Sequence, residues 1–300
     1  MSQRAAAAPA ISSRRRSAWW LSPAHGIAHL GLIAISAIAL LPMAWMLSTS
    51  LKAKGTELEW PIRWIPEPIV WQNYLAAHTI LPFNYYYRNT VTIAILACLG
   101  TVITTSMAGY AFARLRFVGR GPLFVMVMAT MMLPGIVTLI PSYIIWRTLG
   151  WIDTLVPLIV PSWLAASGGA YSDAFCIFLF RQFFMTLPYE LDDAARVDGA
   201  STYRILFQIL LPLCGPVIAA VGIFTFVDHW TEFLGPLIYL NSDRMRTVSI
   251  GLALGSGTFR NTYNYIMAVA FVMTLPIVVL FFSAQRYFMK GIVMTGMAGR

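Results

Sequence analysis

Charged residues are scarce in this chain of 300 residues. Asp, Glu, Lys and Arg make up 11% of the sequence, whereas hydrophobic residues make up 58% and the mean hydropathy is +0.69. A soluble domain carries about 25% charged residues, so this composition excludes a soluble globular fold. The chain is therefore predicted to lie in a lipid bilayer.

Lysine and cysteine are also rare, and each shortage excludes a kind of site. None of the three lysines follows a glycine, whereas a P-loop needs Gly-Lys before Ser or Thr to hold nucleotide phosphates. We therefore do not expect this chain to hydrolyse ATP. The three cysteines lie in apolar segments without C-x-x-C spacing, and the four histidines are scattered, which predicts neither a metal site nor disulfides. Without H-E-x-x-H or G-x-S-x-G motifs, we expect no enzyme, no catalytic residue and no cofactor.

Long runs without charge are what the sequence does contain. A membrane-spanning helix needs about 20 apolar residues, and six regions meet or nearly meet that length. These six predicted spans are residues 26–51, 89–113, 121–146, 155–179, 205–227 and 261–285. The region 155–179 is the weakest because it contains Asp173 and Gly168-Gly169, which make a broken helix a candidate there. The fold class expected is all-α, a polytopic membrane protein with six transmembrane helices.

The distribution of basic residues predicts the orientation. With the N-terminus inside, thirteen Lys and Arg residues fall on the cytoplasmic side and eight outside, which is the bias found in membrane proteins. Residues 1–25 and 291–300 are then cytoplasmic segments. The basic residues are scattered among loops and form no stripe on one face, so lipid headgroups explain the net charge of +9 better than nucleic acid does.

The loop 181–204 is expected to form a short helix of its own. Pro188 suits a first helical position and Gly199 a C-terminal cap. Acidic residues at the start complement the helix dipole; they are Glu190, Asp192 and Asp193. One small, apolar side with an acidic end is predicted from Leu191, Ala194, Ala195 and Asp198. Such a helix could dock in a groove of another protein or lie flat on the membrane surface.

The spacing in and after this loop resembles a known signature. It reads Asp193-Ala194-Ala195, three residues, Gly199, nine residues, Ile209-x-Leu211-Pro212. This is similar to the EAA motif, Glu-Ala-Ala-x3-Gly-x9-Ile-x-Leu-Pro, of the membrane subunits of bacterial ABC importers. The wider sequence resembles the carbohydrate-uptake branch, the maltose-type MalG family; the segments that carry this likeness include Arg181-Gln182-Phe183-Phe184, Leu187-Pro188, Asp198-Gly199-Ala200-Ser201, Asn89-Thr90 and Gly235-Pro236-Leu237-Ile238. The departure is Asp193 in place of Glu.

The resemblance implies a function and partners. It implies a transmembrane domain over 26–290, with the EAA loop at 181–212 forming a coupling helix that sits in a cleft of a cytoplasmic ATPase. The residues it assigns to ATPase coupling are Glu190, Asp193, Ala194, Ala195, Asp198, Gly199 and Pro212. A second related permease chain, an ABC ATPase dimer and an extracytoplasmic solute-binding protein would complete the importer in the bacterial inner membrane. The solute expected is a sugar.

The path of the solute is less well marked in the sequence. The candidates are Asn89, Asp228, Trp230 and Glu232, because intramembrane carboxylates are often functional and sugar sites pair aromatic faces with polar groups. The alternative is that the two acids are solvated at the membrane rim. Pro134-Gly135 and Gly215-Pro216 either interrupt helices near the path or are ordinary packing kinks.

Two alternatives to a sugar importer remain open at this level. One is an ABC permease for another polar solute, such as a glycerophosphodiester or a polyol. The other is a stand-alone secondary carrier, which would be expected to show an internal repeat of broken helices and buried ion-coupling carboxylates. The sequence shows no convincing repeat, and Asp173 is the only deeply placed acid.

Overall fold

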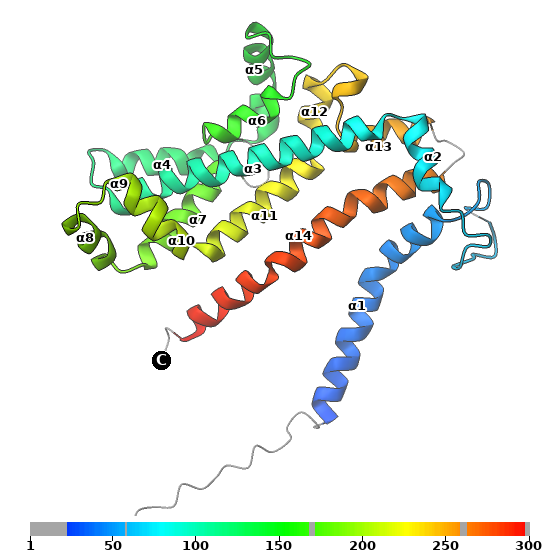
Figure 1. Cartoon of the computed structure of the whole chain (residues 1–300), viewed down its shortest axis with the longest axis horizontal. Coiled ribbons are helices and arrows are strands. Elements are labelled where there is room, and N and C mark those ends of the chain that lie inside the picture. The colour runs from blue at the N-terminus through cyan, green and yellow to red at the C-terminus, as the bar shows by residue number, and fades with distance from the viewer. Residues whose placement is uncertain (1–22, 58, 168–171, 259–262, 298–300) are drawn as a thin grey trace, which may run out of the picture.

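The computed structural model describes residues 23–57, 59–167, 172–258 and 263–297, and all regular secondary structure in these ranges is helical (Figure 1). This confirms the all-α fold class. Most of the N-terminal segment 1–25, Gly168-Gly169 and the last residues of the tail 291–300 lie outside the described residues. Within the described residues, three stretches are long and apolar enough to cross a bilayer by length and composition: Gly26–Ser50 in α1 (Pro23–Ser50), Phe83–Arg114, which is α3, and Tyr263–Gln285 in α14 (Tyr263–Met297).

Two further predicted spans are bent rather than straight. The span 121–146 is divided into α4 (Arg120–Thr130) and α5 (Gly135–Thr148), which meet at 96° beside Pro134. In the span 205–227, the helical segment Thr202–Leu213, which ends with α10 (Leu211–Leu213), meets α11 (Gly215–Thr231) at an angle of 86°. Proline lacks the N–H that a continuous helix needs, and both breaks fall at the pairs Pro134-Gly135 and Gly215-Pro216. Of the two alternatives left open by the sequence, interruption of the helix rather than a mild kink is the one found.

The predicted fourth span, 155–179, is not one helix. It forms α6 (Val156–Trp163) and α7 (Asp173–Thr186), which are separate elements, so the broken geometry is confirmed and a continuous helix is wrong. Asp173 is the first residue of α7, and its carboxylate accepts hydrogen bonds from the Ser167 backbone N–H at 2.6 Å and the Thr101 hydroxyl of α3 at 2.9 Å. By length and composition, the described residues contain three helices that could cross a bilayer, or up to five if each bent pair is one span; six spans stay a prediction.

The helix α3 is the central element of the chain. It packs against α6, α7 and α11 along its length (Figure 1). Glycine permits the closest of these approaches: a Cβ built on Gly109 would lie 2.6 Å from Phe180 Cβ of α7 and 3.0 Å from the backbone nitrogen of Arg181. Small residues at helix crossings allow this contact in a membrane, where packing rather than the hydrophobic effect holds helices together.

The remaining elements connect these helices at the two ends of the molecule. They are α2 (Gln72–Ile80), α8 (Glu190–Val197), α9 (Thr202–Arg204), the π-helix η2 (Ile205–Leu210), α12 (Leu234–Tyr239), the 3-10 helix η3 (Asp243–Met245) and α13 (Val248–Thr258). The helix α8 lies at one end of α3, while α2 and α13 lie at the other (Figure 1).

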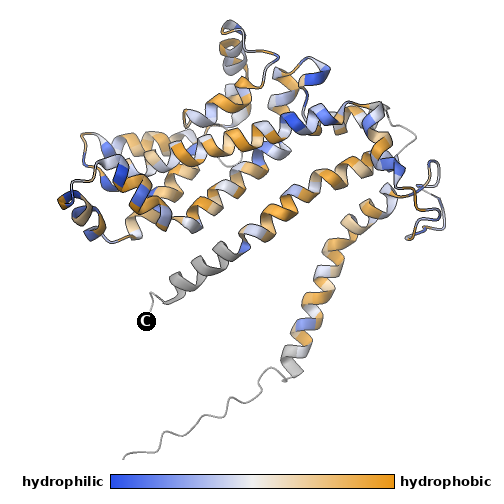
Figure 2. Ribbon diagram, viewed as in Figure 1, coloured by the Kyte–Doolittle hydropathy of each residue, from blue (hydrophilic) through white to orange (hydrophobic). Residues whose placement is uncertain are grey.

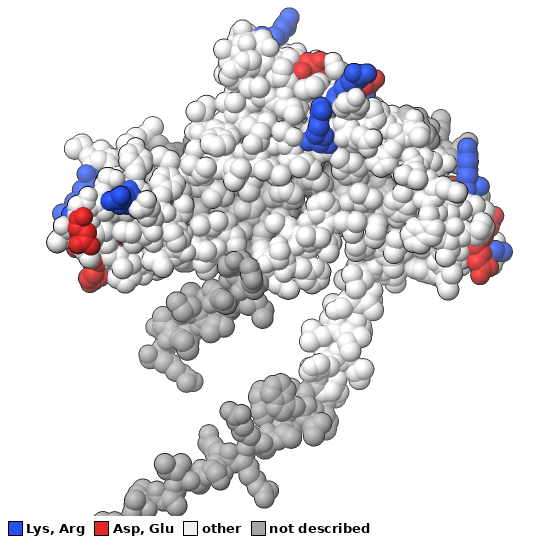
Figure 3. All heavy atoms as spheres, viewed as in Figure 1, with Lys and Arg blue, Asp and Glu red and all other residues white. Residues whose placement is uncertain are grey.

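The surface has the pattern of a membrane protein. Apolar residues cover much of α1 and α14 in Figure 2, and side chains such as Ile27 and Ile38 of α1 are about two-thirds exposed, at 72% and 69%. Charged residues gather at the ends of the long helices and near α5 and α12, with uncharged surface between them (Figure 3). Because α1 packs mainly against α14, most of its apolar surface is left for lipid or for another chain.

Candidate functional site

The predicted short helix is present as α8, and its start differs slightly from the expectation. The helix begins at Glu190 rather than Pro188, with Tyr189 at the N-cap position. The Tyr189 carbonyl accepts the backbone N–H groups of Asp192 and Asp193. Glu190, Asp192 and Asp193 lie in the first turn and Arg196 in the last, so all four charges favour the helix dipole.

The end of α8 confirms the predicted glycine cap. Gly199 has a φ of +77°, a left-handed conformation that suits glycine. Its N–H donates to the Arg196 carbonyl at 3.0 Å, and the Ala200 N–H donates to the Ala195 carbonyl at 2.9 Å. This pair of bonds is the Schellman motif, which satisfies the last carbonyls of a helix. A helix of eight residues is only marginally stable on its own. These two bonds stabilise its C-terminal end.

The two faces of α8 differ from the predicted arrangement. Ala195 is 7% exposed and packs inward, whereas Ala194 is exposed. Placing both alanines on one side was wrong, because successive residues in an α-helix point about 100° apart. The exposed face carries Glu190, Asp193, Ala194, Val197 and Asp198, with Val197 88% exposed. We call these five residues the outer face of α8.

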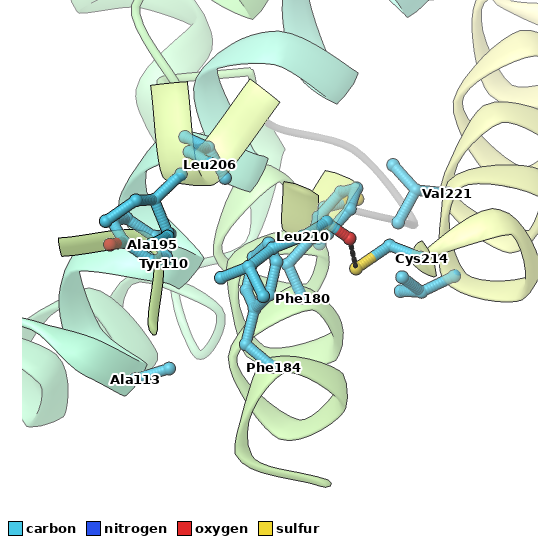
Figure 4. Close-up of a cluster of buried hydrophobic side chains, with 12 residues drawn as sticks. Tyr110, Ala113, Phe180, Phe184, Ala195, Leu206, Leu210, Cys214 and Val221 are labelled. Atoms are coloured by element: carbon cyan, nitrogen blue, oxygen red, sulfur yellow. Dashed lines mark hydrogen bonds between the residues drawn. The ribbon is translucent and has the colours of Figure 1, made fainter. Parts of the chain in front are cut away.

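The inward side of α8 joins the largest apolar core of the chain. Ala195 belongs to a cluster of buried residues that α3, α7, the π-helix η2 and α11 also supply (Figure 4). Its other members are Tyr110, Ala113, Cys176, Phe180, Phe184, Ile205, Leu206, Leu210, Cys214, Val217 and Val221. The short helix is therefore fixed on the ends of membrane-spanning elements and does not lie apart on the surface.

A buried ion pair adds to this apolar contact. Arg114, the last residue of α3, places Nη1 3.3 Å from Asp192 Oδ2 of α8, with the two side chains only 1% and 4% exposed. The other terminal nitrogen of Arg114, Nη2, donates to the carbonyls of Phe184 and Leu187, both at 2.6 Å. The guanidinium also lies 4.0 Å from the ring centroid of Tyr189. The ends of α3 and α7 and the start of α8 thus meet at one arginine.

Sequence reasoning missed the role of this pair. The sequence led to no role for Arg114, and Asp192 was interpreted only as one of three acids complementing the helix dipole. The available signal was an arginine directly after a long apolar run, because a charge in that position needs a partner if it is buried. Nothing in the sequence says which of the three acids turns inward.

The last residue assigned to coupling, Pro212, belongs to α10 and not to α8. It is exposed and lies between the buried residues Leu210 and Cys214 of the same core. The chain from Gly199 to Pro212 passes through the π-helix η2, a rare geometry that often marks functional sites.

Two of the four path candidates use their polar atoms within the chain. Asn89 is buried, and its amide donates to the carbonyls of Arg244 at 2.8 Å and Arg246 at 3.0 Å. Trp230 is also buried, with its indole N–H donating to the Met273 carbonyl at 2.9 Å. Both residues therefore hold other segments in place.

The two acidic candidates lie at the end of α11. Glu232 accepts a hydrogen bond from the Gly235 N–H at 3.1 Å, and Asp228 lies within electrostatic range of both Glu232 and Asp173. On the same helix, His229 is buried with Nε2 3.3 Å from the Ser162 hydroxyl of α6. Polar groups of α6, α7 and α11 therefore gather near the place where α6 and α7 are separated. No cluster of metal-ligating side chains occurs in the described ranges.

Comparison with known proteins agrees with this architecture. Residues 100–293 match the family described as binding-protein-dependent transport system inner membrane component. The chain is 33% identical over 277 residues to the arabinooligosaccharides transport system permease protein AraQ of Halalkalibacterium halodurans, covering 90% of this chain and 95% of the relative. It is 39% identical over 209 residues to the sn-glycerol-3-phosphate transport system permease protein UgpE of Rhizobium meliloti, covering 69% of this chain and 71% of the relative.

A third relative and a solved structure extend the comparison. The sulfoquinovosyl glycerol transport system permease protein SmoH of Agrobacterium fabrum is 30% identical over 260 residues, covering 87% of this chain and 89% of the relative. The fold is similar to a chain of a bacterial ABC transporter involved in the import of the acidic polysaccharide alginate, with a TM-score of 0.74, 21% identity and coverage of 88% and 96%. The protein belongs to the family of binding-protein-dependent transport system inner membrane components, the permease subunits of ABC importers.

Proposed function

We propose that this permease imports a sugar and that the outer face of α8 docks in a cleft of a cytoplasmic ATPase. The observation that carries the proposal is the division of α8 into two faces. One face is buried in the core of the chain through Asp192 and Ala195, while the other presents acids beside small or apolar residues. A helix fixed on one side and complementary in charge on the other is suited to transmit force from a partner.

The outer face has the features that such docking needs. Glu190, Asp193 and Asp198 would meet basic residues of the ATPase, and Ala194 permits close approach of the two backbones. Ala195 and Gly199 would support the docking indirectly. Ala195 fixes α8 to the core, and Gly199 ends the helix sharply. Pro212 would act at the bend between α10 and α11, where motion of the loop reaches a membrane helix.

We also propose the orientation and the partners. The helix α8, the Arg114 end of α3 and the end of α14 lie toward the same end of the molecule (Figure 1), which suits a cytoplasmic location for all three. Both termini, within the segments 1–25 and 291–300, would then be cytoplasmic. A second permease chain, a dimer of ATPase subunits and an extracytoplasmic solute-binding protein would complete the importer.

For the solute, we favour a sugar over an anion. Asp228 and Glu232 are proposed to line the path, and Asn89 and Trp230 to hold its frame through their bonds to backbone carbonyls. Asp228 interacts electrostatically with Asp173 and with Glu232. Carboxyl groups accept hydrogen bonds from sugar hydroxyls, whereas ionised ones repel a phosphate or sulfonate. The names of the relatives UgpE and SmoH keep anionic solutes as the second candidate.

Co-purification tests the docking role. A tagged native chain, expressed in its own host and extracted in mild detergent, should recover an ATPase and a second permease in stoichiometric amounts. Gly199→Arg should lose the ATPase and keep the second permease, because it disturbs the cap of α8 alone. The matched control is Gly121→Arg in α4, where a side chain also meets open space and both partners should remain.

Three results would count against the proposal. Recovery of the native chain alone would favour a stand-alone carrier. Loss of folded protein in Gly199→Arg would make the glycine a folding requirement. For the solute, labelled arabinotriose and glycerol 3-phosphate would be compared as uptake probes, and uptake of the phosphate alone would contradict the preference for a neutral sugar.

A further inference from the structure

We propose that the Arg114–Asp192 pair is the joint through which movement of α8 moves α3 and α7 together. The inference rests on the proposed docking of α8 with an ATPase, and it identifies Arg114 and Asp192 as positioning residues for that coupling. It concerns the inner face of α8, which would not touch the ATPase. The path of force would run from the outer face, through this pair, to the ends of two membrane helices.

Arg114 connects three helices, α3, α7 and α8, through one side chain. Its backbone ends α3, its Nη2 donates to the carbonyls of Phe184 and Leu187 at the end of α7, and its Nη1 faces Asp192 of α8 at 3.3 Å. Carbonyls at a helix C-terminus carry partial negative charge, which a guanidinium neutralises. Arginine suits this position because its planar group presents several donors in fixed directions, whereas a lysine ammonium is a single point charge.

The link to α8 depends on charge more than on hydrogen bonding. Asp192 Oδ2 and Arg114 Nη1 form an ion pair without hydrogen-bond geometry, and the other carboxylate oxygen accepts the Tyr110 hydroxyl at a long 3.5 Å. Both side chains are almost completely buried, so little water screens their attraction. Loss of either charge leaves the other buried without its counter-charge, which is strongly unfavourable.

The other contacts of α8 with the rest of the chain constrain its direction of movement less strongly. Ala195 adds an apolar contact with no directional preference. The chain leaves α8 through Gly199 and continues into the short α9, whose Ser201 cap bond is long at 3.4 Å. Tyr189 strengthens the same joint, since its ring lies on the guanidinium and its hydroxyl is 3.5 Å from the Ala113 carbonyl. The charged pair is therefore the contact that fixes the direction of α8 relative to α3.

Hydrogen exchange of the assembled importer tests this joint without knowledge of the solute. The complex that co-purifies with the tagged chain would be compared without nucleotide and after trapping with ATP and vanadate. In the native complex, we expect trapping to change exchange at α8 and also at the cytoplasmic ends of α3 and α7. In Asp192→Asn, which keeps the shape of the side chain and removes its charge, the change should remain at α8 and be lost at α3 and α7.

Controls separate this inference from folding and from docking. Asp153→Asn removes one negative charge from the loop between α5 and α6, where the carboxylate bonds to Asn241 and Ser242 and not to α8, and its response to trapping at α3 and α7 should be that of the native complex. ATPase recovery of Asp192→Asn should match the native complex, whereas its melting temperature should fall, because Arg114 stays buried without its counter-charge. If this variant does not fold, Arg114→Met with Asp192→Leu replaces the pair with apolar side chains, an exchange that stability often tolerates, and the same loss at α3 and α7 is expected.

The outcomes differ for the two proposals. If the native chain recovers no ATPase, the docking proposal fails. If ATPase recovery is intact but α3 and α7 respond to trapping in Asp192→Asn as they do in the native complex, the joint is refuted. Failure of both variants to fold would assign the pair to folding alone and would also overturn the joint.

Discussion

Replacing Gly109 with alanine should destabilise the contact that carries Arg114 to α8. The added Cβ would lie 2.6 Å from Phe180 Cβ, 3.0 Å from the Arg181 backbone nitrogen and 3.2 Å from the Ile177 carbonyl oxygen. Two of these three neighbours are backbone atoms of α7, which cannot rotate away. The helices α3 and α7 must therefore separate.

The magnitude follows from two opposing effects. Overpacking of a well-packed contact costs about 1–3 kcal/mol, while alanine is favoured over glycine inside a helix by up to about 1 kcal/mol. We expect a net loss of about 1–2 kcal/mol in the free energy of unfolding. A loss of 1 kcal/mol lowers the melting temperature by about 2–4 °C in a chain of a few hundred residues, so the shift is measurable.

Thermal melting in detergent, followed by tryptophan fluorescence, provides the assay. The matched control is Gly222→Ala in α11, where the new Cβ would meet only Cys98 Sγ, at 3.9 Å. That variant should melt at or slightly above the native temperature, because it gains helix propensity without a clash. If Gly109→Ala melts as high as Gly222→Ala, close packing of α3 on α7 is not what requires glycine at this position.

Three further predictions concern the ends of the helices. At Gly199, with its φ of +77°, valine should lower the melting temperature more than asparagine does, because left-handed backbone is most costly for β-branched residues; equal shifts would argue against the cap. Hydrogen bonds from the Ser242 hydroxyl and N–H, and from the Asn241 N–H, lower the pKa of Asp153 below its ordinary 3.8. This stabilisation is present above the ordinary pKa and is lost as pH falls through the lowered value, so the native melting temperature should fall more steeply than that of Asp153→Asn below about pH 4, and parallel curves would contradict it. Asp228→Asn should alter the KM or rate of solute uptake if Asp228 lines the path, whereas unchanged kinetics would place it at the rim.

The sequence predicted the outline of the coupling region because its signals are local. A helix start rich in acids, a short run of helix and a glycine stop are set by neighbouring residues, and α8 has all three. The broken spans were also marked locally, since proline and glycine interrupt helices through their own backbone. Composition alone was enough to indicate a membrane protein, because a bilayer requires long runs without charge.

The tertiary structure decided which side of α8 faces inward and what holds it there. Asp192 and Asp193 are adjacent acids with the same local environment in the sequence, yet Asp192 is buried against Arg114 and Asp193 is exposed. That choice depends on the position of α3, which depends in turn on how closely Gly109 lets α7 approach. The sequence by itself determined the elements, because helix signals and apolar runs act over a few residues. Only the packed structure determined their pairings, because buried charges find partners through space and not along the chain.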